Sequence, residues 1–334
     1  MSELRLVTGA TGLVGGEIAR QLTERGYPVR ALVRGGSDTS YLESLGVECV
    51  AGDLSDAASL AAAVSGVHMV YHCGARVLDW GPWDKFLAEV VQLTTNLVTA
   101  CEDSSVQRIL HISSVAAFGH PRGKRKFTED EPLEQHLWLW DYYPKAKAMC
   151  EYEVQKFSRA WTIIRPTLTY GPRDRRFLPR LLGALRRGVV RLIGRGDNLL
   201  SLVHVSDVAA GAILAAESEQ AAGRSYNLVP DGEISQRDFI NLVCDSAGLP
   251  PVNSGVPPRL AFGWCFFMEV VYKSLRKPVP PSVTRHSISV MSRSLQFTGE
   301  RARAELGWQP QIDVRTGVRE SVQSLIAAEN GQPG

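Results

Sequence analysis

The chain has 334 residues, of which 44% are hydrophobic and 22% are charged, and its formal net charge is +2. This composition is typical of a soluble globular protein and excludes a disordered, collagen-like or coiled-coil chain. With 37 lysines and arginines against 35 aspartates and glutamates, we expect no nucleic-acid partner, because such binding needs a broad basic surface.

Short apolar segments alternate with helical patterns along the first half of the chain. The predicted strands are 4–8, 29–33, 47–50, 67–72, 108–113 and 162–165, and the clearest helices between them are 13–25 and 143–158. Further along, we predict a strand at 201–205, a helix at 207–217 and a strand at 227–229. This alternation predicts an α/β fold whose parallel sheet is covered on both faces and binds ligands at the carboxyl ends of its strands.

A glycine-rich segment, T-G-A-T-G-L-V-G at residues 8–15, joins the first predicted strand to the first helix. Gly9 would allow the tight turn, Gly12 the approach of the backbone to a pyrophosphate, and Gly15 close packing of helix on strand. The N–H groups at the start of the helix would then face the phosphates. The spacing G-x-x-G-x-x-G resembles that of the extended branch of the short-chain dehydrogenase/reductase superfamily, which includes the NAD-dependent epimerases and dehydratases.

The end of the second predicted strand bears on the choice of dinucleotide. An acidic residue there would bind the ribose 2′-hydroxyl, but the sequence has Arg34, which can pair with a 2′-phosphate, and Ser37 can add a hydrogen bond. We therefore predict NADP(H) as the cofactor, with NAD(H) as the alternative. The resemblance places Asp53 against the adenine, and the plainer alternatives are a solvated Arg34 and a helix N-cap at Asp53. The predicted cofactor-binding residues are Gly9, Thr11, Gly12, Leu13, Gly15, Arg34, Asp53, Leu54, Cys73, Gly74, Ala75, Tyr143, Lys147 and Pro166.

The catalytic residues are expected in two segments. Tyr143 and Lys147 stand at i and i+4, on one face of a helix. A nearby ammonium stabilises a phenolate, so the tyrosine can exchange a proton with a substrate oxygen while a nicotinamide carries the hydride. The resemblance selects Ser114 as the third member, which would hydrogen-bond to the substrate oxygen, and Ser113 is the competing position. One segment departs from the family, since Val90 replaces its usual asparagine in the helix before the fifth strand.

Further motifs extend the resemblance over nearly the whole chain. They are R-P at 165–166, Y-G-P at 170–172, V-H-V-S-D-V at 203–208 and L-G-W at 306–308. The resemblance implies a Rossmann-type, doubly wound parallel sheet with a smaller, mixed α/β C-terminal substrate lobe. We assign the dinucleotide-binding domain to 1–166, with 203–229 packed on it, and the substrate lobe to 167–202 and 230–334.

Two features bear on the substrate. Leu200 stands where nucleotide-sugar enzymes carry an arginine for the diphosphate, so only Arg173, Arg175, Arg176 and Arg195 could compensate. Residues 260–272 are unusually aromatic, and they could line a pocket for a small apolar substrate, pack in the core or a dimer interface, or touch a membrane surface through flanking basic residues. This pattern resembles the group of 3β-hydroxysteroid dehydrogenases and dihydroflavonol reductases.

The resemblance thus implies an enzyme, an NAD(P)-dependent oxidoreductase that interconverts a secondary alcohol and a ketone. Its substrate would be apolar: a steroid or terpenoid, a flavonoid-like compound or a 3-oxo acyl compound. A nucleotide-sugar epimerase or dehydratase with tightly bound NAD and a non-catalytic dinucleotide sensor are the alternatives.

The cysteines and the first residues of the chain indicate whether to expect a metal site and where in the cell the protein would lie. The six cysteines form no C-x-x-C pair and none lies at zinc spacing from a histidine, so we expect no metal site and reduced thiols. No signal-peptide pattern precedes the first predicted strand, and no apolar run is long enough to span a membrane. We therefore expect a cytoplasmic homodimer, with membrane contact through 260–272 as the alternative.

Overall fold

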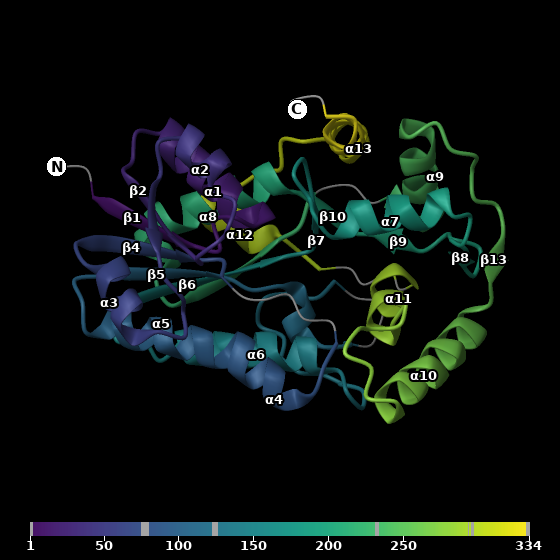
Figure 1. Cartoon of the computed structure of the whole chain (residues 1–334), viewed down its shortest axis with the longest axis horizontal. Coiled ribbons are helices and arrows are strands. Elements are labelled where there is room, and N and C mark those ends of the chain that lie inside the picture. Colours follow the sequence, from purple (N-terminus) through teal and green to yellow (C-terminus); the bar gives the residue numbers. More distant parts are fainter. Residues whose placement is uncertain are drawn as a thin grey trace.

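The computed structural model describes residues 3–74, 80–121, 126–230, 234–292, 294 and 297–331. Seven strands form one parallel sheet at the centre of the larger lobe (Figure 1). In order across the sheet they are β11 (Arg224–Leu228), β6 (Ala160–Pro166), β5 (Arg108–Ile112), β4 (Val67–His72), β1 (Leu4–Thr8), β2 (Val29–Val33) and β3 (Glu48–Ala51). The direction of winding reverses beside β1, so the predicted doubly wound Rossmann-type sheet is confirmed.

Helices cover both faces of this sheet (Figure 1). On one face α1 (Leu13–Glu24) packs against α8 (Val205–Glu217). On the other face α5 (Gln92–Glu102) contacts both α3 (Ala57–Val64) and α6 (Tyr142–Val154). The apolar side chains of strands and helices meet in two buried clusters, and this burial is the main favourable contribution to folding.

Local side chains and the core together set the helix ends. Asp56 caps α3 by accepting hydrogen bonds from the backbone N–H groups of Ala58 and Ser59. Helix α6 ends at Val154, earlier than the predicted end at 158, because Phe157 turns into the core and β6 already begins at Ala160. The remaining short elements of this half are α2 (Ser40–Ser44), α4 (Trp83–Phe86), a π-helical turn (Leu87–Val91) and 3₁₀ turns at Val115–Phe118 and Glu219–Ala221.

The second lobe mixes short strands and helices around a core of its own (Figure 1). Its strand pairs are β7 (Leu168–Tyr170) with β10 (Leu202–His204), β9 (Leu199–Leu200) with β12 (Ile234–Ser235), and β8 (Leu192–Ile193) with β13 (Gly255–Val256). Its helices are α7 (Phe177–Arg186), α9 (Gln236–Ser246), α10 (Pro258–Ser274), α11 (Arg285–Ser292) and α13 (Val314–Glu329). The sequence pattern did not predict α7, α9, α11 or α13. None of the described helices is both long and apolar enough to cross a membrane.

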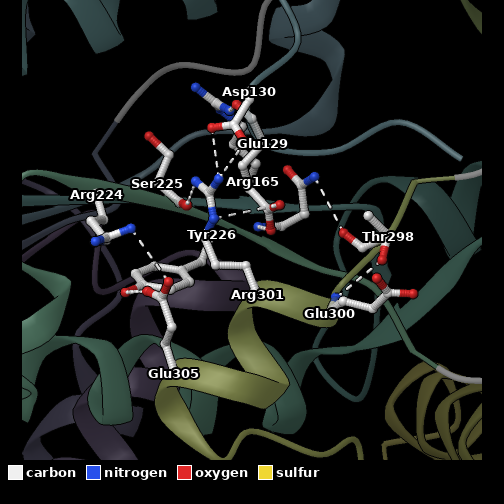
Figure 2. A network of polar contacts seen from close by, with 11 residues as sticks. Glu129, Asp130, Arg165, Arg224, Ser225, Tyr226, Thr298, Glu300, Arg301 and Glu305 are labelled. Atoms are coloured by element: carbon white, nitrogen blue, oxygen red, sulfur yellow. Dashed lines mark hydrogen bonds and ion pairs between the residues drawn. The ribbon is translucent and has the colours of Figure 1, made fainter.

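Helix α12 (Glu300–Leu306) returns to the central sheet, and Figure 2 shows the polar contacts that hold it there. Arg301 forms two contacts of 2.6 and 2.7 Å with the carboxylate of Asp130 and lies 3.9 Å from Glu129. Glu305 accepts a hydrogen bond of 2.7 Å from the Tyr226 hydroxyl on β11. Helix α12 therefore packs on the Rossmann-type sheet, although it falls in the range 230–334 that the sequence assigns to the substrate lobe. The domain bounds stay a prediction.

A buried ion pair joins α6 to β6. Arg165 donates to both carboxylate oxygens of Glu151 at distances of 2.6 to 3.1 Å, and the two side chains are 5% and 0% exposed. The hydroxyl of Ser113 donates to the same carboxylate at 2.5 Å. A buried charge without a partner is strongly destabilising, so this pair restricts α6 to one position on the sheet.

We predict that Glu151→Gln destabilises the protein by about 3–5 kcal/mol, because the Arg165 guanidinium stays buried without its counter-charge. Urea unfolding of both proteins measures the difference. Glu329→Gln is the matched control, since its ion pair with Arg186 is exposed and contributes little. Equal losses in the two variants would contradict the role given to the buried pair.

Candidate active site

A cavity of about 980 Å³ lies along the carboxyl ends of the central strands. Residues from the ends of β1, β2, β4, β5 and β6 line it, together with residues of the second lobe. This edge is where parallel sheets bind their ligands, and the volume lies at the upper end of the range of small-molecule and cofactor sites. The cavity is therefore large enough to hold a cofactor.

The glycine-rich loop forms one wall of this cavity. Gly9 has a φ of +68°, and a Cβ on it would lie 2.7 Å from the carbonyl oxygen of Cys73. A Cβ on Gly15 would collide with the backbone of Gly9. Gly12 stands at the N-terminus of α1, where no side chain caps the first turn. The turn, the close packing and the uncapped helix end all fit a dinucleotide pyrophosphate.

A buried hydrogen-bond chain supports this loop from the end of β4. Thr8 Oγ1 lies 2.8 Å from Nδ1 of His72 and accepts a bond of 3.2 Å from the N–H of Gly74. Burial and the Lys147 ammonium lower the pKa of His72 to about 3, so its imidazole is neutral. Burial also raises the pKa of the Cys73 thiol to about 12, so that residue offers packing and backbone contacts rather than a thiolate. Ala75 lies outside the described residues.

Residues that follow β2 and β3 line one end of the cavity. Arg34, Ser37, Asp53 and Leu54 all face it. The Asp53 carboxylate accepts hydrogen bonds from the hydroxyl and the N–H of Ser55, and these bonds lower its pKa, with a further contribution from Arg34. Because Asp56 is the N-cap of the following helix α3, Asp53 does not have that role.

Arginines of the loop between β7 and α7 reach the same end. The Arg173 guanidinium lies 3.7 Å from the ring centroid of Tyr41 on α2, and Arg175 lies 3.8 Å from Asp38. Both contacts are with the segment that follows β2. Arg176 also lines the cavity, whereas Arg195 is exposed and pairs with Asp197 at 3.0 Å. Leu200 is buried in the core of the second lobe.

Ser114, Tyr143 and Lys147 line the cavity together. Lys147 is buried on α6, and its Nζ donates to the carbonyl oxygen of Ile112 at 3.2 Å. The Ser113 hydroxyl donates its hydrogen bond to the Glu151 carboxylate. The hydroxyl oxygen of Ser114 accepts a bond from the N–H of Ala116 at 3.1 Å, so its O–H remains available to a substrate. The geometry favours Ser114 over Ser113.

Two other segments singled out in the sequence lie away from the cavity. Val90 is buried in the π-helical turn, so the position of the family's asparagine presents no polar group. No residue of α10 is among those lining the cavity. Instead Leu260, Trp264 and Phe267 are 66%, 63% and 56% exposed, so core packing is wrong for these three side chains.

His120, Asp141 and His286 form a further group at the cavity, which no pattern in the sequence indicates. His120 Nε2 lies 2.5 Å from one oxygen of Asp141, and His286 Nδ1 lies 3.6 Å from the other. Both histidines line the cavity, and the His286 ring meets that of Tyr143 at a centroid distance of 5.5 Å. No local motif joins these residues, because they belong to three distant segments.

The sequence of this chain is similar to those of known oxidoreductases. Residues 5–228 match the NAD dependent epimerase/dehydratase family. The 2-alkyl-3-oxoalkanoate reductase of Stenotrophomonas maltophilia is 29% identical over 96% of this chain and 99% of its own length. The decarboxylating sterol-4-alpha-carboxylate 3-dehydrogenase of Mus musculus is 27% identical over 96% of this chain and 90% of its own length.

Solved structures share the fold along the whole chain. The crystal structure of gox2253 is 30% identical, with a TM-score of 0.81 and full coverage of both chains. The structure of MoeE5 in complex with UDP-glucuronic acid and NAD is 21% identical, with a TM-score of 0.74 over 98% of this chain and 100% of that one. The chain therefore belongs to the NAD-dependent epimerase/dehydratase family of extended short-chain dehydrogenase/reductases, and it is an NAD(P)-dependent oxidoreductase.

Proposed function

We propose that the protein interconverts a secondary alcohol and a ketone on an apolar 3-hydroxy or 3-oxo acid. One observation carries this proposal: Ser114, Tyr143 and Lys147 line the same cavity as the glycine-rich loop. Two relatives support the substrate class. The names of both place the reacting oxygen on the carbon next to the one that bears a carboxyl group, in an alkanoate or in a sterol.

Each of the three residues has a distinct role in this reaction. When bound, the nicotinamide supplies or accepts the hydride. In reduction, the Ser114 hydroxyl donates a hydrogen bond to the ketone oxygen, and Tyr143 passes its proton to that oxygen as the carbon receives the hydride. Lys147, anchored on the carbonyl of Ile112, stabilises the phenolate that remains. In oxidation the same proton returns to Tyr143.

The two alternative functions fit less well. A nucleotide-sugar epimerase or dehydratase needs a cation for the diphosphate, but Leu200 is buried in the lobe core and Arg173 and Arg175 contact the segment after β2. A non-catalytic dinucleotide sensor would have no need of a serine, tyrosine and lysine at one cavity. We therefore favour the reductase.

NADP(H) is the proposed cofactor. Arg34 and Ser37 line the cavity after β2, where the ribose of the adenosine would lie. Arg173 and Arg175 add positive charge to this end of the cavity, although Asp38 pairs with Arg175. A 2′-phosphate would bind arginine in charge-assisted hydrogen bonds.

The exposed face of α10 supports the proposal of membrane contact over that of a pocket wall. Leu260, Trp264 and Phe267 recur at helical spacing on this face, and Arg259, Arg276 and Lys277 are exposed near its ends. A cytoplasmic protein with apolar residues between basic ones can rest on an anionic membrane surface. Homodimerisation through the same face is the competing proposal.

Tyr143→Phe tests the proton transfer. We expect kcat to fall by about 10²–10⁴-fold, because the variant has no proton to exchange with the substrate oxygen. The affinity for NADPH, measured by fluorescence titration, should stay the same. Tyr142→Phe is the control, since Tyr142 packs on Trp83 and Phe86. A fall in kcat of less than threefold for Tyr143→Phe would remove this residue from the mechanism.

Arg34→Asp tests the choice of cofactor. A hydrogen bond to a charged phosphate is worth about 1.5–3 kcal/mol, so the ratio of kcat/KM for NADPH to that for NADH should fall by roughly 10–100-fold. Arg195→Asp, at an exposed site away from the cavity, should leave the ratio unchanged. A wild-type enzyme that already prefers NADH would show that Arg34 does not select the cofactor.

Trp264→Ser tests the surface of α10. We expect the wild-type protein to sediment with vesicles that contain phosphatidylserine and the variant to bind several-fold more weakly, since it loses buried apolar area at the interface. Gel filtration of both proteins without lipid reports the oligomeric state. A dimer that Trp264→Ser converts to a monomer, with no vesicle binding by either protein, would identify this face as a dimer interface instead.

A further inference from the structure

A buried carboxylate holds two histidines beside Tyr143. The Asp141 side chain is 4% exposed, and it stands directly before α6. His120 comes from the segment after β5 and His286 from α11 of the second lobe. Because the ring of His286 faces that of Tyr143, the group lies at the end of the cavity where the substrate oxygen would react.

The Asp141 side chain of this group is ionised. Burial opposes ionisation of Asp141, but its hydrogen bond with His120 and the nearby His286 hold its pKa far below the usual range. One oxygen of this carboxylate meets His120, and the other meets His286. In the described part of the chain, no group of three or more histidine, cysteine, aspartate or glutamate side chains is arranged to hold a metal ion.

The two histidines differ in what they can offer a ligand. His120 stacks on Trp138 at a centroid distance of 3.7 Å, and its second nitrogen lies 3.3 Å from the hydroxyl of Ser289. Its ring is thus fully occupied and buried. The side chain of His286 is 23% exposed and lines the cavity, and its Nδ1 has no hydrogen-bond partner among the described residues. His286 is the member that can donate to a ligand.

Three basic side chains near the substrate end are already engaged. Arg285 pairs with Glu269, donating to its carboxylate at 2.7 Å through both Nε and the backbone N–H. Lys273 lies over the rings of Trp80 and Trp140. Lys147 donates to the Ile112 carbonyl. Among the described basic side chains around Tyr143, His286 is therefore the one best placed to meet an anionic group of the substrate.

We propose that His286, held by Asp141, binds the substrate carboxylate and makes the site selective for alcohols and ketones with a neighbouring carboxyl group. The inference rests on the proposed function, in which Tyr143 acts on the 3-oxygen. In such a substrate the carboxylate and the reacting oxygen are on carbons separated by a single carbon. The side chains that would receive them, His286 and Tyr143, are likewise neighbours in the wall of the cavity.

The test compares a 2-alkyl-3-hydroxy acid with its methyl ester, both oxidised with NADP⁺. For His286→Gln we expect the ratio of kcat/KM for acid to that for ester to fall at least tenfold, mainly through KM of the acid. His286→Lys places a positive charge at this position and should recover part of the ratio. His68→Gln, which changes a histidine outside the cavity that pairs with Glu3, should leave the ratio unchanged.

The outcomes separate the two proposals. If the wild type oxidises neither acid nor ester, while nucleotide sugars are turned over, the proposed function fails. If the wild type oxidises both compounds and His286→Gln affects them equally, or if His286→Lys recovers none of the ratio, the role of His286 is wrong and the proposed function remains. A lower melting temperature with an unchanged ratio would assign His286 a structural role only.

Discussion

The ion pair between Glu151 and Arg165 is the constraint on which the site depends. Two charges removed from water cost several kcal/mol unless their hydrogen bonds are satisfied, and here Ser113 and the Glu129 carbonyl take up the remaining donors and acceptors. Only one placement of α6 on the sheet meets this requirement. Because Tyr143 and Lys147 are on the same helix, the buried pair also fixes where they face the cavity.

The position of α6 brings together three parts of the chain. Ser114 follows β5 of the central sheet, Tyr143 is in the first turn of α6, and His286 is on α11 of the second lobe. Asp141, just before α6, links this turn to both His120 and His286. The substrate end of the cavity is thus built between the two lobes, and the nucleotide end is built almost wholly from the turns that follow the strands.

The two ends of the cavity differ in chemistry. Arginines gather near the segment after β2, where a phosphorylated ribose would need cations. Near Tyr143 the charges are paired or covered by aromatic rings, with Glu269 on Arg285 and Trp138 on His120. Such an environment suits an apolar substrate with one anionic group, because the half-buried imidazole of His286 is left to bind that group.

The sequence by itself determined the strands of the sheet, the glycine-rich loop and the Tyr143–Lys147 spacing, since each depends on residues within a few positions of one another. It could not determine which serine is free, because Ser113 is engaged by Glu151 from α6. Nor could it show that the aromatics of α10 face outward or that Leu200 is buried. The association of His120, Asp141 and His286 also came only from the tertiary structure. Local periodicity says which side chains share a face, but the partner that covers each face comes from a segment distant in the chain.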